Sequence, residues 1–122
     1  MTRKMKIWNR DFDINIVFDV YDGEEVLQEQ KSALEAFGNA EDELLSDTSE
    51  VEKYCIKNNQ KEIGDTVSNI FKYVIPTTLL ICRKAGTHKV ALLCNYRFDE
   101  EHGIALVFEN EKLERICSQE GI

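Results

Sequence analysis

The residues of this chain that are best suited to chemistry lie in one short stretch, Phe98–Gly103, which reads FDEEHG. Asp99, Glu101 and His102 place carboxylates and an imidazole in a single connection, and Gly103 closes it. A carboxylate within hydrogen-bond reach of a histidine suits general acid–base catalysis. Several converging ligands of these types can hold a metal ion. The stretch is therefore a candidate catalytic or metal centre.

Two other interpretations compete with a catalytic one. An Asp side chain can accept backbone N–H groups within a turn, and a glycine can adopt the positive φ that ends such a turn. Asp99 and Gly103 therefore also fit a structural loop, and the polar side chains of the stretch also fit a recognition site. The sequence favours the structural loop and predicts no catalytic residue.

The spacing of these residues argues against a convergent site. Neighbours in an extended chain point to opposite sides, so Glu101 and His102 should diverge, and His102 should share a side with Glu100. The other histidine, His88, lies beyond the far end of a predicted strand, on the order of 30 Å away at about 3.3 Å per residue. We therefore expect no metal site and no cofactor. The sequence also contains no nucleotide-binding, zinc-protease or nucleophile-elbow motif.

The segments that position this stretch are predicted strands. Lys89–Tyr96 is apolar on both faces, which predicts a central strand. It should pair in an antiparallel meander with Thr77–Cys82, Ile104–Phe108 and Leu113–Cys117. The core of the meander should include the following side chains: Val90, Leu92, Leu106, Phe108 and Leu113.

The first half of the chain predicts one or two strands followed by helices. Residues 12–20 alternate between apolar and polar side chains, which is typical of a half-buried strand, and Ile7–Asn9 begins an earlier strand or leads into this one. Apolar spacings of three and four predict helices over 25–37, 40–57 and 66–74, ended by Gly38–Asn39, Asn58–Asn59 and Pro76. The order predicts an α+β domain in which two to three helices cover one face of an antiparallel sheet.

Length and composition predict a single domain over 1–122. The chain has 122 residues, of which 43% are hydrophobic and 31% are charged. A chain of this length can form a hydrophobic core without disulfides or a bound metal. No apolar run approaches the ~20 residues of a membrane helix, and no signal-peptide core follows the basic N-terminus. We therefore expect a cytoplasmic protein. In that compartment its four scattered cysteines should be reduced, buried and free of metal: Cys55, Cys82, Cys94 and Cys117.

The net charge of −8 is unevenly distributed along the chain. Between Asp11 and Glu52 there are fourteen acidic residues and one basic residue, Lys31. The resulting field repels nucleic acid and anionic membranes and attracts cationic partners. The charge serves either solubility alone or a docking face for a basic protein. The residues proposed for that face are Glu41, Asp42, Glu43, Asp47 and Glu50.

The second half of the chain resembles an uncharacterised family of small bacterial cytosolic domains. Its signature, aromatic-Asp-x-Glu-His-Gly-apolar between two late strands, is matched after Pro76 by Phe98, Asp99, Glu101, His102, Gly103 and Ile104. The family more often has Trp at the aromatic position. Some relatives lie near bacterial toxin systems, in which small acidic proteins act as immunity partners. The resemblance implies the fold, the compartment and a partner-binding role.

The sequence therefore favours a non-enzymatic, acidic, cytosolic binding protein that holds a basic protein, with an immunity-like role as one form of this hypothesis. Nucleic acid and membrane are not expected partners, because the basic residues are scattered and do not alternate with aromatic ones. The alternative is a small enzyme or metal-dependent protein centred on Asp99, Glu101 and His102.

Overall fold

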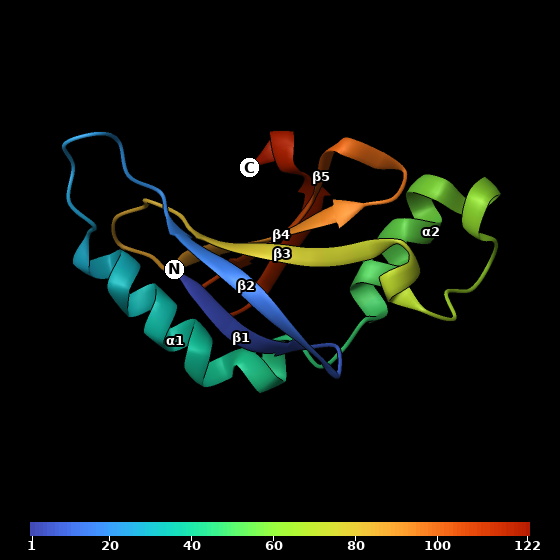
Figure 1. Cartoon of the computed structure of the whole chain (residues 1–122), viewed down its shortest axis with the longest axis horizontal. Helices are drawn as coiled ribbons and strands as arrows, with labels where there is room; N and C mark the ends of the chain where they lie inside the picture. The colour runs from blue at the N-terminus through green and yellow to red at the C-terminus, as the bar shows by residue number, and fades with distance from the viewer.

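Six strands form a single sheet in which the spatial order of the strands follows the chain (Figure 1). The computed structural model describes residues 1–122. All neighbouring strands pair antiparallel except β2 and β3, which are parallel and are joined by the two helices. The strands are β1 (Thr2–Ile7), β2 (Arg10–Phe18), β3 (Val74–Ile81), β4 (Lys89–Tyr96), β5 (Asp99–Glu109) and β6 (Leu113–Ser118).

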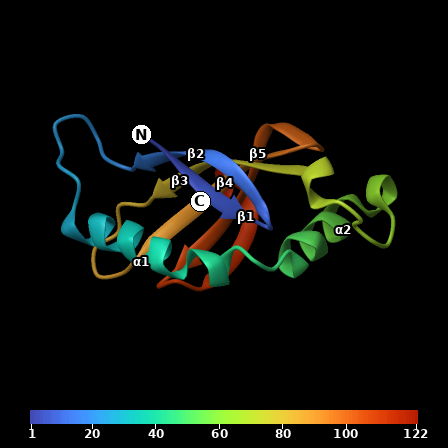
Figure 2. The same cartoon turned by 60° about the horizontal axis from the view of Figure 1, so that its bottom comes forward.

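The two helices, α1 (Gln28–Leu44) and α2 (Ser49–Ile63), follow one another along one side of the sheet (Figure 2). Two short 3₁₀ turns, η1 (Ile70–Lys72) and η2 (Gln119–Gly121), complete the elements. This arrangement confirms the predicted α+β class. The parallel pair is a departure from an all-antiparallel sheet, and it follows from the crossover, because a long helical connection can return the chain parallel to its start. Neither helix is long and apolar enough to cross a membrane.

The first hairpin corrects the prediction for Ile7–Asn9. The strand β1 ends at Ile7, and Trp8 and Asn9 form a two-residue turn with φ of 52° and 69°. In β2 the predicted alternation holds, since Ile14 and Ile16 are buried between exposed neighbours. The turn places the Trp8 side chain back against the core, where the residue is 5% exposed.

The helix boundaries differ from those predicted, and the reason lies at Gly38. The helix α1 runs through Gly38 and Asn39 instead of ending there. A Cβ added to Gly38 would lie 2.8 Å from a guanidinium nitrogen of Arg3, whose Nη2 also lies 3.4 Å from a carboxylate oxygen of Glu41. The Arg3 side chain from β1 therefore lies over Gly38, and the glycine does not mark the end of the helix.

The later helical predictions are also corrected. The helix α2 begins at Ser49 and ends at Ile63, before Gly64, whose φ is 94°. At the predicted end the helix is kinked, because Asn59 has non-helical φ and ψ, but it continues beyond that residue. The predicted third helix over 66–74 is only the single turn η1, capped by Asn69. Pro76 lies inside β3, where the register with β4 shifts, because a proline cannot donate to a regular ladder.

The C-terminal meander confirms the predicted central position of β4 between β3 and β5. The Cys82 N–H donates to the carbonyl of Lys89 at 2.9 Å, which is the predicted register. Four of the five predicted core residues are buried: Val90, Leu92, Leu106 and Phe108. The fifth, Leu113, is 36% exposed, because it begins the edge strand β6.

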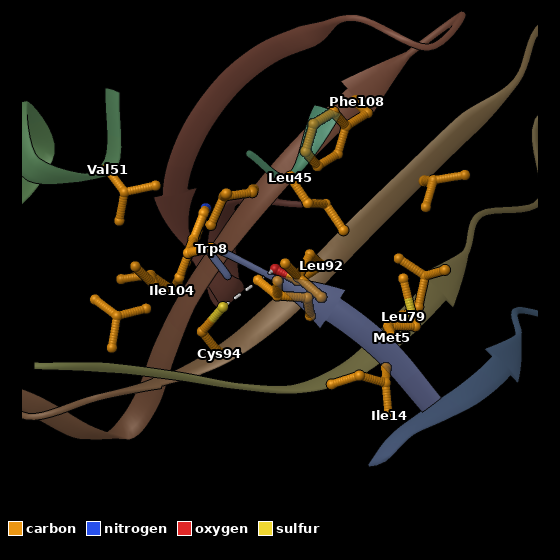
Figure 3. Packing of buried hydrophobic residues seen from close by; sticks show 14 of the residues in the cluster. Met5, Trp8, Ile14, Leu45, Val51, Leu79, Leu92, Cys94, Ile104 and Phe108 are labelled. Carbon is orange, nitrogen blue, oxygen red and sulfur yellow. Dashed lines mark hydrogen bonds between the residues drawn. The ribbon is translucent and has the colours of Figure 1, made fainter. Parts of the chain in front are cut away.

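Buried aliphatic and aromatic side chains from the sheet and both helices form one core, shown from close by in Figure 3. Two of the cysteines, Cys55 and Cys94, are buried in it, whereas Cys82 and Cys117 are partly exposed, so the prediction of four buried cysteines is wrong for two of them. All four are free thiols. Burial raises the pKa of the thiols of Cys55, Cys82 and Cys94, which keeps them protonated.

Candidate functional site

The stretch Asp99–Gly103 is the beginning of the strand β5 and not a loop. The turn of the β4–β5 hairpin lies just before it, at Arg97 and Phe98. The prediction of a loop is therefore wrong. Charged side chains are tolerated in this strand because Asp99 and His102 are only partly buried and the two residues between them are exposed. The apolar, buried part of β5 begins at Gly103.

His102 lies between two carboxylates. Its Nδ1 is 3.2 Å from Oδ1 of Asp99, which also accepts the backbone N–H of His102 at 3.2 Å. Its Nε2 is 2.6 Å from Oε1 of Glu120, in the turn η2. The contact with Asp99 was not predicted, since residues three apart in an extended strand point to opposite sides. Glu120 was missed, since nothing in the sequence indicates that the C-terminal turn reaches this strand.

Gly103 is enclosed by its neighbours. Its φ is 66°, and an added Cβ would lie 2.4 Å from the carbonyl oxygen of Cys94 and 2.7 Å from Nε2 of Gln119. The same Gln119 nitrogen donates to the carbonyl oxygens of Cys94 and Ile104, at 3.1 and 3.3 Å. The turn η2 therefore packs against Gly103 and His102, and hydrogen bonds from Gln119 attach it to β4 and β5. We call Asp99, His102, Gly103, Gln119 and Glu120 the C-terminal clamp.

The polar side chains of the C-terminal clamp contact one another across the His102 ring. The two carboxylates lie on opposite nitrogens of the His102 ring, so they do not converge on one point. Glu101 is exposed and takes no part in these contacts with the His102 ring. No group of three or more His, Cys, Asp or Glu side chains is arranged to hold a metal ion. A hollow of about 480 Å³ along the hairpin is lined by Glu100 and Arg97 but not by His102. This geometry supports the structural interpretation of the stretch.

The acidic residues of the predicted docking face gather where α1 ends and α2 begins. Glu41 is engaged by Arg3 at 3.4 Å, and its side chain is only 15% exposed. The other four residues are exposed, and we call them the acidic face: Asp42, Glu43, Asp47 and Glu50. The side-chain hydroxyl and backbone N–H of Ser49 donate to Asp47, which lowers the pKa of that carboxyl and keeps it ionised. Glu50 pairs with Lys53 at 3.3 Å on the exposed surface.

The position of Asp42 and Glu43 in the helix is a further correction. They were expected in the first turn of a helix, where acidic side chains are favourable, but they lie in the last turn of α1. The helix C-terminus carries partial negative charge, so acidic residues there are unfavourable by a few tenths of a kcal/mol each. No basic residue shares that turn, and neither carboxylate forms an ion pair within the protein. These two charges do not stabilise the fold.

A hollow of about 310 Å³ opens beside the acidic face, between the α1–α2 connection and the β5–β6 hairpin. Its lining combines apolar side chains from four elements with charged ones at the edge. We call it the acidic hollow. The apolar residues are Trp8, Leu44, Val51, Leu106, Phe108 and Leu113, and the charged ones are Glu43, Asp47, Glu50, Glu111 and Lys112.

The whole chain, residues 1–122, matches the family described as Domain of unknown function (DUF6985). The chain belongs to this family. No curated protein and no solved structure matches it. The match confirms an uncharacterised family, and it covers both halves of the chain, whereas the resemblance in the sequence covered mainly the second half. The site of this DUF6985 domain must therefore be judged from its own geometry.

Trp8 of this family member is nearly buried and lines the acidic hollow, although nothing in the sequence connects it with the acidic residues there. A tryptophan at a hairpin turn with a positive φ is unusual, because bulky residues avoid the left-handed region. The Trp-Asn pair lacks the glycine that marks most such turns, so nothing in the sequence indicates this φ.

Replacing His102 by alanine tests the structural interpretation of the C-terminal clamp. The ring is partly exposed, so losing its contacts with Asp99 and Glu120 should reduce the free energy of unfolding by only about 1 kcal/mol. Urea denaturation followed by circular dichroism measures this change. Glu101→Ala, at the exposed neighbouring position, is the control and should leave the midpoint unchanged. Equal midpoints for the two variants would contradict a role of His102 in the clamp.

Proposed function

We propose that this protein is a non-enzymatic binding protein that holds a basic protein on its acidic face. The observation that carries the proposal is the placement of Asp42 and Glu43 at the C-terminal end of α1, exposed and without an ion pair. Charges that disfavour the helix and have no partner within the protein are explained by a partner outside it. Asp47 and Glu50 extend the same surface onto the start of α2.

The proposal includes the cytoplasm as the compartment and an immunity-like role as one form of the function. Four free thiols fit a reducing compartment. In the immunity-like form, the partner is a toxin whose basic surface the acidic face covers. Electrostatic complementarity of this kind speeds association and selects the partner. A catalytic role for Asp99, Glu101 and His102 gains no support from the geometry of the C-terminal clamp.

The decisive experiment compares two variants of equal charge. In the first, the acidic face is neutralised by Asp42→Asn, Glu43→Gln, Asp47→Asn and Glu50→Gln. In the second, four exposed acids elsewhere are neutralised by Asp22→Asn, Glu25→Gln, Glu35→Gln and Glu101→Gln. Wild type and both variants are used to capture proteins from extracts of the source cells. A basic protein retained by wild type is identified, purified and titrated against all three by calorimetry.

We expect the face variant to bind the purified basic protein at least a hundredfold more weakly than wild type, and the control variant to lose less than tenfold. Affinity for wild type should also fall as salt is raised, because the contact is between charged surfaces. Equal losses in the two variants, or the absence of any basic protein that binds wild type in purified form, would refute the proposal.

A further inference from the structure

The acidic hollow has the size and lining of a site for a single side chain. Its volume of about 310 Å³ lies at the lower end of the range of about 300–1,000 Å³ for ligand pockets. Its floor is apolar, with Val51, Leu106 and Phe108 almost fully buried beneath it. Its edge carries Glu43 and Asp47 from the acidic face. The hollow is therefore continuous with the surface on which the proposed function rests.

The indole of Trp8 presents an unused hydrogen-bond donor to this hollow. The residue is 5% exposed, and the acidic hollow is the surface depression to which it contributes. Its Nε1–H donates to no group of the protein, although no fully buried polar atom lacks a partner. The indole N–H is therefore not fully buried, and Trp8 is one of the residues that line the acidic hollow. In Figure 3 the indole nitrogen lies on the side of the ring toward Val51 and Leu45. A buried indole N–H usually has a hydrogen-bond partner. This unpaired donor therefore indicates a ligand that supplies an acceptor.

The charges at the edge select a cation. Glu43 and Asp47 carry carboxylates that form no ion pair within the protein. Glu111 also lines the hollow, but its carboxylate lies 3.0 Å from Nδ1 of His88. Lys112 is the single basic residue of the lining. An anionic ligand would be repelled from this edge.

An arginine side chain matches the apolar floor and the acidic edge of the hollow. Its methylene stem suits an apolar floor, its planar guanidinium stacks on aromatic rings, and its five N–H donors bind carboxylates in a fork. Arginine has no acceptor for the Trp8 N–H. A backbone carbonyl next to the arginine provides one, so the ligand is a segment of polypeptide and not a free guanidinium ion.

We infer that the acidic hollow receives an arginine side chain of a basic partner protein, and that Trp8 donates to a backbone carbonyl beside that arginine. This inference rests on the proposed function and deepens it by assigning the residue type that the partner inserts. Recognition of that arginine should therefore depend more on Glu43 and Asp47 than on the other residues of the acidic face.

The single tryptophan allows a direct test by NMR. A ¹⁵N-labelled protein gives one indole N–H signal, which is followed while a capped hexa-arginine peptide is added. We expect the signal to move and to saturate, because the N–H gains an acceptor and is shielded from solvent. A capped hexalysine peptide should move it less than half as far, since it lacks the planar fork. A capped hexaglutamate peptide should not move it.

Two double variants of equal charge complete the test. Glu43→Gln with Asp47→Asn should weaken hexa-arginine binding at least tenfold, and Asp22→Asn with Glu25→Gln should weaken it less than twofold. The inference is overturned if the indole signal stays fixed at saturation, if hexalysine moves it equally, or if the two double variants lose affinity equally. In each of these cases binding of a basic protein to the acidic face is still decided by the capture experiment, so the two proposals can fail separately.

Discussion

The Gly103→Val variant is expected to lose about 4 kcal/mol or more of its free energy of unfolding. A β-branched residue is strained at a φ of 66°, and its Cβ would lie 2.4 Å from the carbonyl oxygen of Cys94. Relief of that clash moves β5 away from β4 and displaces Gln119, which then loses its two hydrogen bonds. Thermal melting followed by circular dichroism should show a midpoint lower by roughly 12 °C or more for a domain of this size.

Gly86 provides a matched control for this variant. Its φ is 81°, so valine is strained there too, but no atom lies within 4 Å of an added Cβ. Gly86→Val should therefore lose only about 1–3 kcal/mol. The difference between the two variants isolates the crowding at Gly103 and the attachment of η2. A loss no greater at Gly103 than at Gly86 would show that the C-terminal clamp contributes nothing to stability.

Much of the sheet could be predicted because its signals are local. The alternation in β2 and the continuous apolar run of β4 both reflect which faces are buried, and burial is the main determinant of such patterns. The short turn at Asn110 and Glu111 ends β5 where it was expected. Strand pairing then followed from the sequential order of the strands. The parallel pairing of β2 with β3 depends on the path of both helices, which no local pattern specifies.

The helix boundaries were misplaced where a glycine has a tertiary role. Gly38 carries the same local signal as a helix end, and only the approach of Arg3 from β1 distinguishes the two cases. The shift had consequences for the acidic face, because Asp42 and Glu43 moved from the favourable start of one helix to the unfavourable end of another. The strongest argument for a binding role therefore became available only with the fold.

The candidate site was predicted in composition but not in geometry. Asp99, His102 and Gly103 do act together, yet through Gln119 and Glu120, which the sequence did not connect with them. Contacts between residues so far apart along the chain depend on where a terminal turn docks. In the same way, the acidic hollow joins residues from the β1–β2 turn, both helices and the last hairpin. The distribution of charge along the chain therefore could not indicate its apolar floor.

Replacing Gln30 by glutamate is expected to cost about 3–5 kcal/mol at pH 7. Gln30 is the one buried polar residue, at 1% exposure. Its Nε2 donates to the carbonyl oxygens of Asp19 and Ile81, at 3.0 and 3.1 Å, and its Oε1 accepts from the N–H of Leu27 at 2.8 Å. These bonds join the start of α1 to the ends of β2 and β3. A carboxylate would place negative oxygen against two carbonyl oxygens.

The loss at position 30 should depend on pH in a defined direction. Burial beside two carbonyls raises the pKa of the introduced glutamate in the folded state above its unfolded value of about 4.3. The folded protein then binds more protons than the unfolded one, so the free energy of unfolding falls as pH rises from about 4.3 through the folded pKa. Below that window the neutral acid can donate to one carbonyl, and the variant should regain part of its stability relative to wild type. Urea denaturation at pH 7 and pH 5 measures both effects.

Gln28→Glu, at the exposed first position of α1, is the control and should change the free energy of unfolding by less than about 0.5 kcal/mol at either pH. A Gln30→Glu variant that tracks this control would mean that the polar connection between α1 and the sheet is not needed for the fold.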